Sequence, residues 1–582
     1  MEKLEMDIVK KIKLTINGRE VEAPEGCTIL DAAKAAGINI PTLCYLENTS
    51  VTGACRICVV EVGGARNLIP ACAFPASEGM DIQTHSPRVR QARKTIIELL
   101  IANHPPDCLK CERNGTCKLQ ELAEEYGVRD VRYKGRMREN LPDLASPSIE
   151  RDPEKCILCG RCVKICEEVQ SVSAIDFTKR GFDTIVTPTF NKSLEETVCV
   201  NCGQCIMVCP TGALKERSSI RQVFEAIYDT KKHVIVQTAP AIRVTIGEAM
   251  GMDSGVISTG KMVTSLRRIG FDKVFDTNFA ADLTIMEEGS ELVERITKGG
   301  VLPMMTSCSP GWIKFIEHFY PSLIPNLSTC KSPHQMLGAL AKSYYAQKQG
   351  IDPKDIFVVS IMPCTAKKYE CQRSEMEVDE IRDVDAVLTT RELVKVLKSL
   401  GIDFASLEES KFDSLLGIAT GAGDIFGASG GVMEAALRSA YYLITGKELS
   451  YIDFYSVRGL EGAKEAVIPI DGMNLKVAVV NSLSQARKLM DRILKGEADY
   501  HFIEVMTCPG GCIAGGGQPI NTDPERIKAR LKSIYKIDAN KGLRASYHNP
   551  DVQRVYEEFL KKPLSEVSHK HLHTHYVERP GV

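Results

Sequence analysis

Two short segments of alternating hydrophobic and polar residues open the chain. Residues 11–23, KIKLTINGREVEA, alternate on both sides of Asn17 and Gly18. An Asn-Gly pair between alternating segments indicates a two-residue hairpin turn, because both residues adopt positive φ readily. The next segment, TILDAAKAAG, predicts a helix that Thr28 caps and Gly37 ends. With the cysteine-bearing loop that follows, these elements predict a small α+β domain.

The hydrophobic pattern changes twice along the rest of the chain. A helical pattern, PRVRQARKTIIELLIAN, occupies residues 87–103, and residues 140–155 are rich in Pro, Ser and Asp, which is typical of a linker. From about residue 218, strand-like runs at 233–240 and 356–364 alternate with helical runs such as EEGSELVERITKG. This alternation predicts a large α/β domain.

Composition sets limits on the class of protein. The chain is 44% hydrophobic and 25% charged, which excludes a collagen-like, coiled-coil or largely disordered protein. Its 582 residues predict about three to four domains. The net charge of -2 gives no reason to expect a nucleic acid partner. We find no apolar run near the ~18 residues of a membrane span, and MEKLEMDIVKKIK has no signal-peptide core. We therefore expect a cytoplasmic protein that does not bind a membrane.

Cysteine provides the strongest evidence of chemistry. In a reducing compartment the 22 cysteines are not expected to form structural disulfides. Eight of them form a repeat with C-x2-C-x2-C-x3-C spacing, typical of a ferredoxin with two [4Fe-4S] clusters, although four thiolates also suit zinc. In such a ferredoxin the fourth cysteine of each run binds the other cluster. The predicted ligand sets are Cys156, Cys159, Cys162 and Cys209, and Cys166, Cys199, Cys202 and Cys205.

Two further groups lie upstream of the repeat. The first domain contains Cys44, Cys55, Cys58 and Cys72. Their spacing differs from the plant-type ferredoxin pattern, so an iron–sulfur cluster, a zinc site and buried thiols all remain open at this point. The second group is His104, Cys108, Cys111 and Cys117. One imidazole and three thiolates can hold a [4Fe-4S] cluster or zinc, and the position between iron–sulfur modules favours the cluster.

Three segments in the second half of the chain carry the remaining candidate metal ligands: TSCSPGW (306–312), MPCTAKK (362–368) and EVMTCPGGCIAGGGQP (504–519). Together they resemble the signature segments of iron-only, or [FeFe], hydrogenases, and the resemblance covers essentially the whole chain. It implies a multidomain α+β and α/β protein. The implied domains are a β-grasp [2Fe-2S] ferredoxin-like domain (1–84), a histidine-ligated [4Fe-4S] domain (85–145), a two-cluster [4Fe-4S] ferredoxin domain (146–217) and a large α/β H-cluster domain (218–582).

The resemblance also implies an activity. Members of this family interconvert dihydrogen with protons and electrons at an H-cluster, a [4Fe-4S] cubane bridged through one thiolate to a diiron unit with CO and cyanide ligands. The expected cofactors are this H-cluster, three further [4Fe-4S] clusters and one [2Fe-2S] cluster. By resemblance Cys364, Cys508 and Cys512 bind the cubane, with Cys512 bridging to the diiron unit, and Lys367 donates a hydrogen bond to a cyanide. The residues expected to close the pocket are Pro240, Met362, Phe426 and Met506.

The first signature segment departs from the family pattern. The usual segment is TSCCP, whose second cysteine binds the cubane and whose first relays protons, whereas this chain has Cys308 and Ser309. Cys330 stands in STCKSP, where a small residue is expected. Our hypothesis is that Cys308 and Cys330 share the ligand and relay roles, with a buried thiol as the alternative for Cys330. His334 also replaces an expected glutamine.

A proton relay is expected from the same resemblance. Glu288 and Glu291 are three residues apart on a predicted helix and so share one of its faces. With Ser328 and Arg295 they match the relay positions of the family, and the route ends at Cys308. Without the resemblance, the two glutamates would be read as a solvated helix turn.

Three interpretations of the function remain. The serine variant, with the full set of accessory clusters, is most like catalytic subunits of multimeric, electron-bifurcating hydrogenases, whose partners are NAD/flavin-binding and iron–sulfur subunits and ferredoxin. A stand-alone ferredoxin-dependent hydrogenase is the nearest alternative. A non-catalytic iron–sulfur assembly or electron-transfer protein is the third. The Gly-rich run 421–431 does not match a dinucleotide fingerprint. For the histidine-rich tail, 569–576, we expect packing against the domain rather than metal binding.

Overall fold

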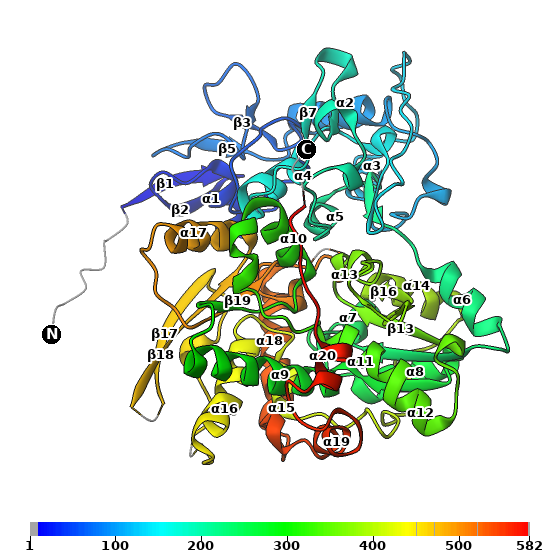
Figure 1. Ribbon diagram of the computed structural model, residues 1–582. Coiled ribbons are helices and arrows are strands. Elements are labelled where there is room, and N and C mark those ends of the chain that lie inside the picture. Colours follow the sequence, from blue (N-terminus) through cyan, green and yellow to red (C-terminus); the bar gives the residue numbers. More distant parts are fainter. Residues whose placement is uncertain (1–9, 450, 471, 521, 580–582) are drawn as a thin grey trace.

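Five short strands form the N-terminal sheet of the computed structural model, which describes residues 10–449, 451–470, 472–520 and 522–579 (Figure 1). The predicted hairpin is confirmed, since β1 and β2 pair antiparallel around Asn17 and Gly18, both at positive φ. The predicted helix is confirmed as α1, which begins after a capping box made by Thr28 and Asp31. The elements are β1 (Lys11–Ile16), β2 (Arg19–Pro24), α1 (Ile29–Ala35), β3 (Val59–Val62), β4 (Ile69–Pro70) and β5 (Asp81–Gln83), in sheet order β2-β1-β5-β3-β4.

Two helices, α2 (Pro87–Ile101) and α3 (Lys118–Glu125), flank the His104 group. The predicted helix at 87–103 is thus confirmed. It begins there because the side chain of Ser86 accepts a hydrogen bond from the backbone N–H of Val89.

The segment 140–155, predicted to be a linker, is more ordered than expected. It contains the strand β6 (Ile149–Arg151), which pairs antiparallel with β9 (Leu214–Glu216). Ser146 is fully buried, and its Oγ donates a hydrogen bond to Asn201 Oδ1 at 3.1 Å. Serine and proline suggested an exposed connection, but hydrogen bonds let these small polar residues pack inside the protein.

Two similar units, each a cysteine loop followed by a short helix, form the next domain. A glycine with positive φ precedes each helix, Gly160 in the first unit and Gly203 in the second. A side chain at Gly203 would overlap Thr365 of the large domain, so this loop lies directly against that domain. The elements are α4 (Arg161–Lys164), β7 (Asp176–Thr178), β8 (Ile185–Thr187) and α5 (Gln204–Val208).

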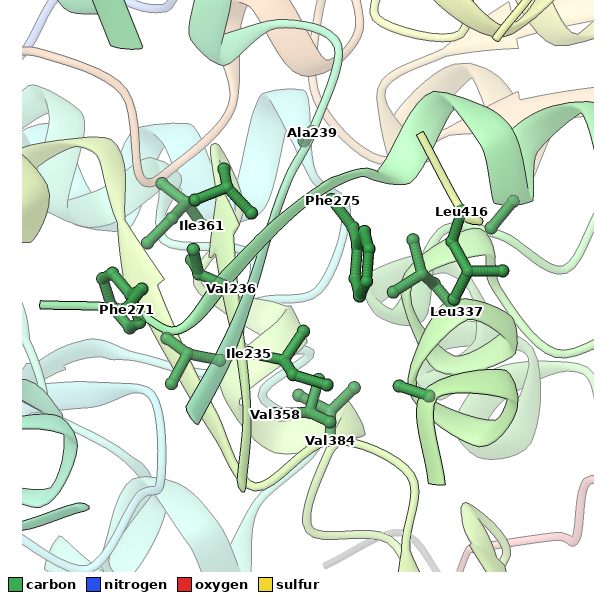
Figure 2. Close-up of a cluster of buried hydrophobic side chains, with 14 of the residues drawn as sticks. Ile235, Val236, Ala239, Phe271, Phe275, Leu337, Val358, Ile361, Val384 and Leu416 are labelled. Atoms are coloured by element: carbon green, nitrogen blue, oxygen red, sulfur yellow. The ribbon is translucent and has the colours of Figure 1, made fainter. Parts of the chain in front are cut away.

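The large domain contains two sheets, the first of which is fully parallel. Its order is β11-β10-β13-β16, and the strands at 233–240 and 356–364 predicted from sequence are its central pair. Figure 2 shows Ile235 and Val236 of β10 with Val358 and Ile361 of β13 among the buried side chains that hold its layers together. The strands are β10 (His233–Thr238), β11 (Lys273–Asp276), β13 (Ile356–Met362) and β16 (Ala386–Thr389). The helices around them are α6 (Ile220–Tyr228), α8 (Thr259–Ile269), α9 (Thr277–Lys298), α11 (Pro333–Leu340) and α14 (Thr390–Ser399).

The second sheet has the order β12-β19-β18-β17, in which only β17 is antiparallel to its neighbour. Buried Glu504 in β19 accepts hydrogen bonds from the backbone N–H groups of Gly430 and Met433, which fixes the start of α16 on this sheet. The strands are β12 (Met304–Met305), β17 (Ala463–Ile470), β18 (Met473–Asn481) and β19 (Phe502–Met506). The helices are α10 (Pro310–Phe319), α15 (Gly421–Ile425), α16 (Gly431–Thr445), α17 (Leu483–Leu494) and α18 (Pro524–Ala539).

The C-terminal segment packs on the large domain, as the sequence analysis expected for the histidine-rich tail. After α19 (Pro550–Val555) and α20 (Glu566–Leu572), the chain crosses the domain in an extended conformation (Figure 1). The backbone N–H of Lys331 donates to Leu572 O, and that of Thr574 donates to Thr329 O. Among the described residues, no helix is both long and apolar enough to cross a membrane.

Candidate active site

A cavity of about 810 Å³ lies beyond the carboxyl ends of parallel strands from both sheets of the large domain. The chain leaves β10 toward Pro240, β13 toward Cys364, β12 toward Cys308 and β19 toward Cys508, and all four residues line the cavity. Cys512 lines it as well. The fold thus brings the three signature segments into one site, although about 200 residues separate the first from the last.

The residues expected to close the pocket all line this cavity. They are Pro240 after β10, Met362 at the end of β13, Phe426 after α15 and Met506 at the end of β19. Phe426 is placed there by the Gly-rich run, in which Gly427 packs against the backbone of Ala241. Apolar walls of this kind keep water away from a reactive metal centre.

A buried charged group supports Lys367 at the cavity wall. The ammonium of Lys367 donates to Glu370 Oε2 at 2.9 Å, to Ser332 Oγ at 3.0 Å and to the carbonyl of Cys308 at 3.3 Å. Burial acts to raise the pKa of Glu370, but Lys367 and His334 outweigh it and bring that pKa to about 2. His334 Nε2 lies 2.5 Å from the same oxygen, and burial together with Lys367 lowers its pKa to about 4. The sequence analysis missed Glu370, whose position three residues after Lys367 was its only signal.

The donor set fits an iron cubane. Burial raises the pKa of the Cys364, Cys508 and Cys512 thiols, that of Cys512 to about 12, and the neighbouring thiols raise the last two further. Three thiols that approach one another in an apolar cavity are costly to ionise without cations. Iron removes this cost by binding the thiolates directly, and four buried irons need this kind of soft ligand.

The structure separates Cys308 from Cys330, the two cysteines that were expected to share the ligand and relay roles. Cys308 and Ser309 line the cavity, whereas Cys330 is not among its lining residues. The Cys330 thiol instead lies 4.0 Å from Glu291 Oε2, and an isolated backbone bridge to His573 holds Cys330 against the C-terminal segment. Its assignment to the metal ligands therefore finds no support in this geometry, and the alternative of a buried thiol describes it better.

The predicted relay residues form a row beside the cavity. The guanidinium of Arg295 donates to Glu291 Oε1 at 2.7 Å, and Ser328 Oγ donates to Glu291 Oε2 at 2.9 Å. Further in, Glu288 is buried, and among the described residues neither of its carboxyl oxygens has a hydrogen-bond partner. Burial and the charge of Glu291 raise the pKa of Glu288 to about 8. A carboxyl group with this pKa holds and releases a proton near neutral pH.

The repeat cysteines line two smaller cavities. One, of about 480 Å³, is lined by Cys156, Cys159, Cys162 and Cys209, and the other, of about 450 Å³, by Cys166, Cys199, Cys202 and Cys205. The structure therefore brings together the two crossed sets that the spacing predicts. Their binding of iron stays a prediction.

The structure also brings the four cysteines of the first domain together. The Cys58 and Cys72 sulfurs lie 3.4 Å apart, and hydrogen bonds from Cys55 and Cys72 lower the pKa of Cys44, so these four thiols form one group. Cys27 is partly buried and packs against the hydrophobic residues of this domain.

The His104 group is more open than the others. Cys108 is exposed, and Cys111 and Cys117 are half-buried. Burial lowers the pKa of His104, and its buried Nδ1 has no hydrogen-bond partner among the described residues. A neutral imidazole with a free nitrogen suits a metal ligand, so this group also fits its predicted cluster.

Family models match five parts of the chain. They describe a 2Fe-2S iron-sulfur cluster binding domain (residues 9–87), an NADH-ubiquinone oxidoreductase-G iron-sulfur binding region (93–132), a 4Fe-4S dicluster domain (146–213), the C-terminal domain of the iron only hydrogenase large subunit (232–516) and an iron hydrogenase small subunit (524–579).

Individual relatives match nearly the whole chain. It is 51% identical to the NADP-reducing hydrogenase subunit HndD of Solidesulfovibrio fructosivorans, over 98% of this chain and 99% of that protein. It is 43% identical to iron hydrogenase 1 of Clostridium pasteurianum, over 97% of this chain and 99% of that protein. A solved [FeFe]-hydrogenase from Chlamydomonas reinhardtii, itself a variant, is 44% identical with a TM-score of 0.57, and covers 63% of this chain and 100% of its own. The chain therefore belongs to the [FeFe] hydrogenase large-subunit family, and it is an [FeFe] hydrogenase with accessory iron–sulfur regions before its H-cluster domain.

Proposed function

We propose that this hydrogenase is the catalytic subunit of a cytoplasmic multisubunit complex that exchanges electrons with NAD or NADP and with ferredoxin in an electron-bifurcating reaction. We assign nucleotide and flavin binding to partner subunits, and the Gly-rich run 421–431 of this chain instead forms α15 and the turn beside the cavity. The relative HndD, 51% identical over its whole length, is named as a subunit of an NADP-reducing hydrogenase.

The observation that carries this proposal is a branched row of cysteine groups. Cys202 lines both the active-site cavity and the nearer of the two repeat cavities, so electrons pass between these two sites first. The segments around the other repeat cavity, which is lined by Cys156, Cys159, Cys162 and Cys209, contact both the first domain and the His104 group. Arg161, in its cysteine loop, donates to the carbonyl of Tyr45 at 2.9 Å, and the backbone N–H of Lys118 donates to the carbonyl of Pro210 at 2.9 Å.

These two contacts lead to different cysteine groups. Tyr45 follows Cys44 of the N-terminal domain, and Lys118 follows Cys117 of the His104 group. Two exits from one row suit an enzyme that serves two electron partners, whereas a stand-alone enzyme with one acceptor needs only one exit. We assign one [2Fe-2S] cluster to the first exit and three further [4Fe-4S] clusters to the His104 group and the repeat.

Within the active site, the chain's own residues bind the cofactor and move protons. Cys364, Cys508 and Cys512 would hold the cubane, and the Lys367 ammonium, oriented by Glu370, would supply a positive charge and a hydrogen-bond donor at the wall beside the diiron unit. When bound, the H-cluster supplies the metal site at which dihydrogen is split or formed and the cubane through which electrons leave or enter.

Protons use the row of residues beside the cavity. We propose that they pass from Arg295 and Glu291 through Ser328 to Glu288, and from Glu288 to the thiol of Cys308. The charge of Glu288 acts on the Cys308 thiol, whose pKa burial and Glu288 both raise, so this thiol stays protonated until it can transfer its proton.

The test uses the complex with its partner subunits and one variant in each exit. Cys58→Ser removes a ligand at the N-terminal exit, Cys111→Ser one at the His104 exit, and Cys27→Ser is the control in the first domain. We expect each exit variant to lose hydrogen-driven reduction of one physiological acceptor while reduction of a viologen dye persists, and the control to keep both. The proposal fails if the chain alone reduces ferredoxin at the full rate of the complex, since this result indicates the stand-alone enzyme.

A further inference from the structure

The active-site cavity is lined by four thiols of the signature segments, and the proposed relay uses one of them, Cys308, which leaves three for the cubane. It is also lined by Ser309, which stands where the usual family segment has its second cysteine. Cys364 follows β13, and Cys508 and Cys512 follow β19. Ser309 approaches the same cavity from the start of α10. A cubane needs four protein ligands, so a three-thiol site leaves one iron to be bound by another group.

The Ser309 hydroxyl points toward the Cys508 loop and away from its own helix. Serine at an N-cap usually accepts a hydrogen bond from a backbone N–H in the first turn, but Ser309, the N-cap of α10, makes no such bond. Its Oγ instead lies 2.8 Å from Thr507 Oγ1 and accepts a hydrogen bond from the backbone N–H of Thr507 at 3.4 Å. Thr507 directly precedes Cys508, so Ser309 is tied to the loop that carries two of the thiols.

This approach depends on a glycine. Gly311, in the first turn of α10, lies so close to Thr507 that an added Cβ would be 3.0 Å from both its Oγ1 and its Cγ2. The sequence Ser309-Pro310-Gly311 therefore lets the helix start pack against the Cys508 loop, with the serine oxygen between them.

The neighbouring cysteines are engaged elsewhere. The carbonyl of Cys308 accepts a hydrogen bond from Lys367, and the proposed relay uses the thiol of Cys308. Cys330 lies outside the cavity, beside Glu291. Neither thiol is tied to the Cys508 loop as Ser309 is.

We infer that the side-chain oxygen of Ser309 is the fourth protein ligand of the cubane in this chain. On assembly an Fe–O bond forms, the hydroxyl proton leaves to solvent, and the N–H and hydroxyl of Thr507 donate hydrogen bonds to the bound oxygen. The inference rests on the proposed placement of the cubane on Cys364, Cys508 and Cys512.

A change of ligand from sulfur to oxygen has a measurable consequence. Oxygen is a harder donor than thiolate and stabilises the more oxidised iron, so the cubane should be reduced at a lower potential than one with four thiolates. A lower potential favours the release of electrons from the cubane to the accessory clusters. The single replacement Ser309→Cys should therefore raise the reduction potential of the cubane.

The test is an infrared-monitored redox titration of the full-length, matured enzyme, in which the CO and cyanide bands report the oxidation state of the cubane. We expect Ser309→Cys to keep the bands and titrate at a higher potential. Ser309→Ala should bind less iron and lose most of the band intensity. The matched control is Ser307→Ala, which removes a hydroxyl that donates to the Cys330 carbonyl and should titrate like the unmodified enzyme.

The outcomes separate this inference from the proposal on which it rests. If the unmodified enzyme shows the bands and Cys364→Ala keeps them unchanged, the placement of the cubane is wrong. If Cys364→Ala loses the bands but Ser309→Ala keeps the iron content, band intensity and potential of the unmodified enzyme, only the Ser309 inference is wrong. Loss of the cubane in Cys308→Ala with its retention in Ser309→Ala would likewise assign the fourth position to Cys308.

Discussion

The repeat domain and the active-site cavity gather similar side chains in opposite ways. In the repeat domain, eight cysteines come from two segments of 11 residues, 156–166 and 199–209, and each short loop delivers most of a ligand set by itself. In the active site, the proposed ligands come from the ends of strands in two different sheets. The spacing of cysteines along the chain is enough to predict a site of the first kind. A site of the second kind forms only when both sheets have folded.

The two regions also differ in what surrounds their thiols. The repeat cavities are lined mostly by apolar side chains, which suits centres that only exchange electrons. The active site has a buried ion pair at one wall and a row of titratable groups at another. Chemistry that moves protons therefore needs a polar framework that electron transfer does not.

The largest effect should come from removing a thiol in the cavity. Cys512→Ala should abolish hydrogen turnover and the CO and cyanide infrared bands, because Cys512 is the residue proposed to link the two parts of the H-cluster. Cys162→Ala in the repeat should lower the iron content but keep these bands. Equal loss of the bands in both variants would show that the two regions do not assemble independently.

The next effect concerns the relay. Glu288→Gln should lower turnover on the order of 10²-fold or more, since it removes a proton donor and acceptor without changing shape. Glu294→Gln, an exposed change on the same helix, is the control and should have no effect. Proton reduction by the unmodified enzyme should also fall as the pH rises through about 8, where Glu288 loses its proton. A turnover of Glu288→Gln close to that of the control would contradict the relay.

Glu288 should also affect stability. Its pKa is raised from the ordinary value of 4.5 to about 8 in the folded protein. Its contribution to folding is therefore fully present below about pH 4.5 and is lost as the pH rises through about 8. Glu288→Gln should remove this loss, which denaturant titrations at pH 7 and pH 9 can measure.

A smaller effect is expected from replacing Glu370 at the cavity wall, and it concerns the free energy of unfolding. Glu370→Gln leaves the buried Lys367 ammonium without its carboxylate, which should lower the free energy of unfolding by about 3 kcal/mol. Glu375→Gln, a half-buried carboxylate in the same segment, is a milder comparison. Denaturant unfolding of the unmatured chain measures both, and an equal loss in the two variants would contradict a special role for Glu370.

The smallest effect is expected at Cys330. Cys330→Ala removes one buried sulfur atom and should cost about 1 kcal/mol of stability while leaving the infrared bands unchanged. Loss of the bands would return Cys330 to the ligand set and would contradict its placement beside Glu291.

Sequence reasoning predicted most of the fold and much of the site. The Asn17-Gly18 hairpin, the Thr28 cap and the central strands of the first sheet follow from local propensity and periodicity, and the structure confirms them. The segment 140–155 was misjudged, since Ser146 and Ser148 are buried and Ser146 forms a hydrogen bond with Asn201 that no local pattern reveals.

The amino-acid sequence by itself determined the four groups of cysteines, the crossed pairing in the repeat and the family to which the chain belongs. These follow from spacing, because ligands within one short loop can bind one centre whatever surrounds the loop. The tertiary structure alone decided that Ser309 shares the cavity with Cys364, Cys508 and Cys512, that Glu370 supports Lys367 and that Cys330 lies beside the relay. These relations depend on how two sheets and a C-terminal segment pack, and packing joins residues whose separation along the chain carries no signal.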